Sequence, residues 1–173
     1  MKKYLILLLI PVSLLACEKL KDLLRFDINA ETEFTIPRNS VVPIPDIITP
    51  KTTSNFNEQI DNNDTRKDLV KEVKLTEFTL TIEGPSQANF DFVESMSLSI
   101  QTDSLPAIQV ASISDIPETG LTTLDLVTSE AELDEYVKGD GFRVKAEITT
   151  DKTVTYDTEV IGNMTFSVKA DPL

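Results

Sequence analysis

The chain of 173 residues has no histidine, no tryptophan, one cysteine and only five glycines. Without histidine, Ser-His-Asp and Cys-His nucleophilic machinery and the usual zinc sites are excluded. Neither a Ser-x-x-Lys nor a Gly-x-Ser-x-Gly motif is present, and no glycine-rich loop could cradle a phosphate. The sequence therefore predicts no catalytic residues and no cofactor.

Basic side chains are also few, because 16 Lys and Arg face 29 Asp and Glu, which gives a net charge of −13. A chain this acidic repels nucleic-acid phosphates and anionic lipid head groups. We therefore expect no nucleic-acid partner. Any contact with a membrane must come from a lipid anchor, since a polybasic face is absent.

Carboxylate pairs are the one catalytic option that remains, as in glycoside hydrolysis. Asp91 with Glu94, and Asp134 with Glu135, are candidates, but such pairs are frequent in any acidic chain. A solvated surface explains them better than a hydrolase does. The lack of tryptophan further disfavours sugar processing, because sugar sites commonly use aromatic platforms.

Calcium binds carboxylate and amide oxygens, and these are densest in the segment Asp61-Asn62-Asn63-Asp64, with Asp68 nearby. The candidate ligands are Asp61, Asn63, Asp64 and Asp68. They do not match an EF-hand loop, which needs a glycine at its sixth position and a glutamate at its twelfth. Asp140-Gly141 is a weaker candidate. A polar surface loop is the simpler interpretation, so no metal site is predicted.

The first seventeen residues have the layout of a secretory signal peptide: Met1-Lys2-Lys3, an apolar run from Tyr4 to Ala16, and then Cys17. The run is shorter than the roughly 20 residues that span a bilayer as a helix. Its end, Leu14-Leu15-Ala16-Cys17, resembles the lipobox of bacterial lipoproteins. The resemblance implies that residues 1–16 are removed, that Cys17 is acylated, and that residues 17–24 form a lipidated tether. Several acyl chains on Cys17 would hold the protein stably on a bilayer.

The rest of the chain resembles uncharacterised exported lipoproteins of Gram-negative bacteria that are rich in surface lipoproteins, to which no activity attaches. The resemblance implies attachment to the outer membrane. Because residues 18–22 mix acidic and basic charges, both the periplasmic and the cell-surface face stay open. Asp103-Ser104-Leu105 resembles a short O-glycosylation sequon of exported bacterial proteins, although a plain turn before Pro106 explains it equally well.

Residues 25–173 are predicted to form one β-rich domain. Apolar side chains fall on even positions between Phe26 and Ile36, which indicates a long strand with one wet face. Four prolines then mark residues 37–55 as an extended edge segment. Further alternating rows follow Lys71, and residues 121–127 are predicted as one strand.

The end of the chain is predicted as three strands: residues 142–148, residues 154–160, and residues 164–170 after a turn at Gly162-Asn163. One helix is expected before them, with a capping box of Ser129 and Glu132 and a stop at Gly139. A short helix or turn is also expected within residues 55–68, with Thr65 capping residues 66–70.

This pattern predicts an all-β fold, an immunoglobulin-like antiparallel β-sandwich with one short helix; a partly open β-barrel is the alternative. The leading functional hypothesis is a non-catalytic, membrane-tethered protein-interaction module, for example an accessory subunit of an outer-membrane complex. Its partners would be the lipid bilayer, through acylated Cys17, and a second envelope protein. The alternative is a surface adhesin or a glycan-binding lipoprotein.

Overall fold

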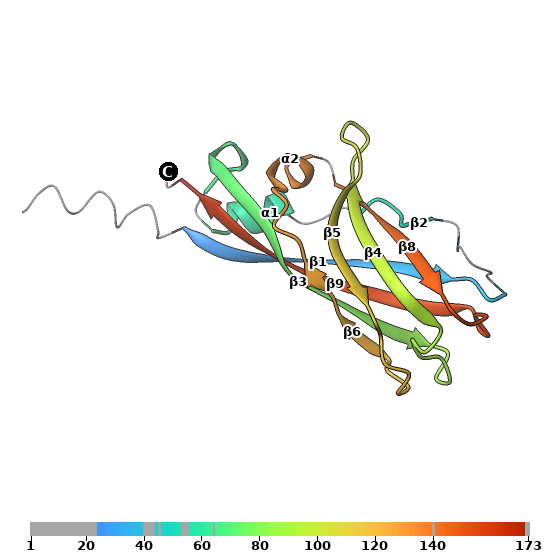
Figure 1. Ribbon diagram of the computed structural model, residues 1–173. Coiled ribbons are helices and arrows are strands. Elements are labelled where there is room, and N and C mark those ends of the chain that lie inside the picture. Colours follow the sequence, from blue (N-terminus) through green and yellow to red (C-terminus); the bar gives the residue numbers. More distant parts are fainter. Residues whose placement is uncertain are drawn as a thin grey trace, which may run out of the picture.

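Two antiparallel β-sheets pack face to face in a computed structural model that describes residues 24–39, 44, 46–52, 56–63, 65–139 and 141–171 (Figure 1). The predicted all-β sandwich is confirmed, and its described strands form two separate sheets instead of a closed barrel.

The first sheet has the strand order β1-β9-β3-β6, and the second has the order β2-β8-β4-β5-β7. The strands of the first sheet are β1 (Arg25–Ile36), β9 (Thr158–Ala170), β3 (Val70–Gly84) and β6 (Thr123–Asp125). Those of the second are β2 (Ile47–Ile48), β8 (Arg143–Thr150), β4 (Val93–Gln101), β5 (Ile108–Ser114) and β7 (Val127–Thr128).

Alternating side chains build the core between the sheets. In β1 the even positions from Phe26 to Ile36 turn inward and the odd positions stay exposed, as the sequence pattern predicts. Phe166 of β9 contacts the rings of Phe142 and Phe56 edge to face, with centroids 5.9 and 6.4 Å away. Phe56 lies in helix α1 (Phe56–Asp61), so this ring cluster fixes α1 to both sheets.

The proline-rich segment supplies an edge strand, as predicted. Within it, β2 pairs only with β8, and the Lys145 ammonium lies 2.8 Å from the carboxylate of Asp46, just before β2. Ile44 is buried, whereas Ile48 is 52% exposed. The apolar residues predicted to pin this segment are Val41, Val42, Ile44, Ile47 and Ile48. The prediction is wrong for the exposed Ile48, and Val41 and Val42 lie outside the described residues.

The predicted turn at Gly162-Asn163 is wrong, because both residues lie inside the continuous strand β9. The chain therefore ends in two strands, β8 and β9, which belong to different sheets. Gly162 serves close packing: a Cβ there would lie 2.8 Å from Phe78, 3.0 Å from Thr32 and 3.2 Å from Leu80. The even positions of β9 turn inward without a break at Gly162. This unbroken alternation is the sequence feature that could have indicated a single strand.

The predicted strand 121–127 is also wrong, because it divides between the sheets. Residues 123–125 pair with β3 as β6, whereas residues 127–128 pair with β5 as β7. Leu126, at the crossing, is buried, and its N–H donates to the Phe78 carbonyl at 2.9 Å. The Leu126 side chain therefore packs in the core at the point where the chain passes from one sheet to the other.

The short helix or turn predicted within residues 55–68 is confirmed as α1, whereas the helix predicted after Ser129 begins later and lacks its predicted cap. Two short α-helices are present, α1 and α2 (Asp134–Val137), together with a 3₁₀ turn over Lys67–Leu69. The Ser129 hydroxyl donates to the Gln109 carbonyl instead of capping a helix, which holds this segment extended until Leu133. Likewise the Thr65 hydroxyl donates to the Asp171 carbonyl, so it caps nothing.

Replacing Gly162 by alanine tests this packing. The added methyl group would press on three core side chains, so we expect Gly162→Ala to lower the free energy of unfolding by about 1–3 kcal/mol. Thermal unfolding of the detergent-solubilised full chain, followed by circular dichroism, measures the change. The matched control is Asn163→Ala, which changes an exposed neighbour in the same strand. Equal stability of the two variants would contradict the packing role.

Candidate functional site

Several sequence candidates lie outside the described residues, namely Cys17 with the rest of the signal and tether segment, and Asp64 and Asp140. The other calcium candidates do not come together as a site. The Asn63 amide donates to the Gln59 carbonyl at 2.7 Å, and Asp68 lies 3.5 Å from Arg66. Among the described residues, no three Asp, Glu, His or Cys side chains are grouped to hold a metal ion.

The two carboxylate pairs serve local structure. The Asp91 carboxylate accepts a 2.8 Å hydrogen bond from the Gly120 N–H, whereas Glu94 is exposed on β4. Asp134 pairs with Lys138 at 3.1 Å, four residues along α2, and Glu135 is exposed beside it. Asp91 therefore ties two loops together, and Asp134 stabilises a single helical turn.

Asp103, in the glycosylation-like sequon, closes an ion-pair network at the tip of the β4–β5 hairpin. Its carboxylate lies 2.6 Å from Arg143 and 3.2 Å from Lys51. The neighbouring N–H groups of Ser104 and Leu105 donate to the Thr102 hydroxyl. The segment is therefore an exposed turn, and glycosylation of Ser104 stays a prediction.

The shifted pKa values all arise in exposed ion pairs. Hydrogen bonds from Arg143 and then Lys51 lower the pKa of Asp103, and a hydrogen bond to Glu118 raises the pKa of Lys152. Hydrogen bonds to Asp46 and Glu147 raise the pKa of Lys145. The pair of Lys74 and Glu130 behaves in the same way, with the lysine pKa raised and the glutamate pKa lowered. Each shift favours the charged form, unlike the shifts that prepare a catalytic acid or base near neutral pH.

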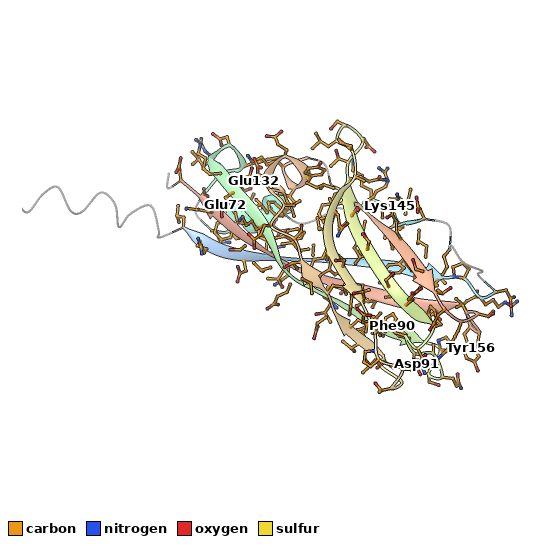
Figure 2. All side chains as sticks on the ribbon, in the orientation of Figure 1. Glu72, Phe90, Asp91, Glu132, Lys145 and Tyr156 are labelled. Carbon is orange, nitrogen blue, oxygen red and sulfur yellow. The ribbon has the colours of Figure 1, made fainter. Side chains whose placement is uncertain are left out.

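A hollow of about 200 Å³ lies at the end of the sandwich opposite Leu24, between the loops that precede β4 and β9. Asp91 and Tyr156 lie close together there (Figure 2). Tyr156 is 42% exposed, and Lys152 on the same rim pairs with Glu118. The charged groups of this hollow are thus already engaged in holding the loops.

A larger groove, of about 600 Å³, lies where edge strand β1 of the first sheet faces edge strand β2 of the second. One wall is apolar and the other carries glutamates. The lining includes Glu33, Thr35, Ile47, Ile48, Glu83 and Glu159. Within the part of the chain that the structure describes, no Lys or Arg lines this seam groove, and none forms an ion pair with its glutamates. No sequence pattern indicated a groove here, since its lining comes from four distant segments.

Helix α1 covers the edge of β1 beside the seam groove. The side-chain amide of Gln59 accepts a 3.3 Å hydrogen bond from the Asn29 N–H and donates a 3.2 Å hydrogen bond to the Asn29 carbonyl. Phe56 and Ile60 of the same helix are buried. The Gln59 side chain therefore bonds the backbone N–H and C=O of Asn29, as a neighbouring strand would.

Comparisons with known proteins give no family for this chain. No family model matches it, and no curated protein matches it. Among solved structures, a chain from desmodium yellow mottle tymovirus is similar over 86% of this chain and 89% of its own length, with 12% sequence identity and a TM-score of 0.28. A likeness at this TM-score carries no argument about fold or function. In the described residues, no helix is long and apolar enough to cross a membrane.

The ion-pair network at Asp103 predicts a pH response. Its lowered pKa means that the carboxylate stabilises the fold above the ordinary aspartate pKa, about 3.9, and loses this effect as the pH falls through the lowered value. In NMR titration the Asp103 carboxyl should have a midpoint below the ordinary value. Arg143→Gln should move it back upward, whereas Arg38→Gln, which removes a charge paired with Asp157, should not. An ordinary midpoint in the unmodified chain would contradict the network.

Proposed function

We propose that this protein is a non-catalytic lipoprotein of the bacterial cell envelope, which acts as a membrane-tethered protein-interaction module. Cys17 carries the lipid that holds it on the outer membrane. The sandwich binds a second envelope protein, for example as an accessory subunit of an outer-membrane complex. The lipobox-like Leu14-Leu15-Ala16-Cys17 and the lack of histidine support this proposal.

The seam groove is the observation that carries the proposal. It offers exposed apolar surface at Ile48 beside carboxylates that form no ion pair among the described residues, a combination that suits a polypeptide better than a small catalytic substrate. Thr35 lies eleven residues along β1 from Leu24, where the described chain begins. At about 3.3 Å per residue this is roughly 35 Å. A protein tethered just before Leu24 would therefore present the groove away from the bilayer.

A glycan-binding adhesin is the second candidate. Its supporting observation is Tyr156, a half-exposed ring beside a small hollow, on which a sugar could stack. Digestion of intact cells with protease separates the two candidates at the first step. An adhesin must be cleaved because it is displayed outside, whereas an accessory subunit of a periplasmic assembly must be protected.

Co-purification tests the leading proposal. The tagged full chain, produced in its native host and extracted in mild detergent, should incorporate labelled palmitate and retain an envelope protein in stoichiometric amount. Cys17→Ala should lose the label and leave the membrane fraction, because the thiol is the only site for the lipid.

The two parts of the proposal fail separately. Recovery of the labelled chain alone, after gentle extraction, would contradict the interaction role. Palmitate label that persists in the Cys17→Ala variant would contradict the anchor.

A further inference from the structure

The backbone groups of β1 face two directions, and the register shows which face outward. The Ala170 N–H donates to the Leu24 carbonyl, and the register of β1 with β9 continues without a shift from Arg25 to Ile36. In an antiparallel ladder, alternate residues bond to the partner strand. The even residues of β1 therefore bond to β9, and the odd residues direct their N–H and C=O groups away from it.

Gln59 supports this assignment independently. It bonds both backbone groups of Asn29, an odd residue, from the side opposite β9. Glu31, Glu33 and Thr35 continue the same row beyond Gln59. Among the described residues, no hydrogen bond is made to their outward N–H and C=O groups.

Strand β1 is the longest of the four edge strands. Native proteins protect sheet edges by keeping them short or covering them, because an open edge pairs with other chains. The edge strands β2, β6 and β7 have two, three and two residues, whereas β1 has twelve. Among the described residues, helix α1 covers the edge at Asn29, and nothing bonds to the outward backbone groups of the stretch from Glu31 to Thr35 beside the seam groove.

The groove walls define what could pair there. An added strand would direct alternate side chains to opposite faces. One set would meet Ile47 and Ile48. The other would lie beside the exposed carboxylates of Glu31 and Glu33 on β1 itself, whereas Glu159 on β9 and Glu83 on β3 lie one and two strands further into the sheet. Since no described basic side chain lines the groove, charge complementarity favours a segment in which apolar and basic residues alternate.

We propose that the open edge of β1, from Glu31 to Thr35, binds an extended basic segment of a partner protein by β-strand addition. The partner contributes main-chain hydrogen bonds, which give affinity, and alternating side chains, which give specificity. Five residues of β1 extend over about 13 Å between the first and last. The inference rests on the proposed interaction role and specifies how the partner is held.

Binding of a defined peptide to the full chain in detergent micelles tests the pairing. The probe is a fluorescent seven-residue peptide of alternating lysine and valine, and fluorescence anisotropy measures its affinity. A peptide with alternating glutamate and valine should not bind. The lysine–valine peptide with alternate backbone nitrogens methylated should also fail, since it keeps its charge but cannot complete the ladder.

The matched variants are Glu33→Pro and Glu33→Ala. Both remove the carboxylate, but only proline removes the outward N–H, at an edge position where proline is tolerated. We expect Glu33→Pro to bind the peptide at least about tenfold more weakly than Glu33→Ala, the effect of one lost hydrogen bond. Circular dichroism checks the fold, and the methylated peptide decides the question if Glu33→Pro does not fold.

Three results would overturn the inference: no binding of the lysine–valine peptide, equal binding of the methylated peptide, or equal affinity of the two folded variants. Failure of the proposed function is distinguishable, because it appears as absence of any co-purified protein. A partner retained equally by the unmodified chain and by Glu33→Pro would keep the interaction role and remove this mode of binding.

Discussion

Strand β9 holds the first sheet together, because it pairs with β1 on one side and with β3 on the other along almost its whole length. The close approach of Phe78, Thr32 and Leu80 over Gly162 lets the three strands pack without a gap at their centre. The same pairing brings Leu24 beside Ala170, so the start and the end of the described chain lie together. It also leaves β1 as the outer strand.

The outer strand β1 is long and only partly covered among the described residues, and the proposed interaction with a partner protein depends on this edge. Among the described residues, three of the four edge strands have only two or three residues, and they cover only part of the strands beside them. The fourth is long and is covered at Asn29 by a side chain of α1, whose own position depends on the packing of Phe56 against Phe166. What is left open is bordered by Ile48 and by carboxylates. Backbone donors, apolar surface and charge thus occur at one place, although they come from distant segments.

The sequence predicts the parts of the fold that depend on alternation alone. The long strand β1, the proline-marked edge at β2 and the buried row of β8 are where the pattern places them. It fails where tertiary packing decides: Gly162 is a contact point in a strand instead of a turn, and Leu126 crosses between sheets. The seam groove was not predictable, because alternation shows which face of a strand is buried but not which strand lies outermost. The calcium candidates fail as a group for a similar reason, since nearness in sequence did not bring Asn63 and Asp68 to a common point.

Residue-resolved amide hydrogen exchange of the full chain tests the open edge of β1 most directly. The N–H groups of the even residues from Ile28 to Phe34 should exchange slowly because they bond to β9. The Asn29 N–H should be protected by its hydrogen bond to Gln59. Glu31, Glu33 and Thr35 should exchange much faster than these neighbours in the same strand. Slow exchange at all three would mean that their outward groups are already bonded, and it would contradict the account.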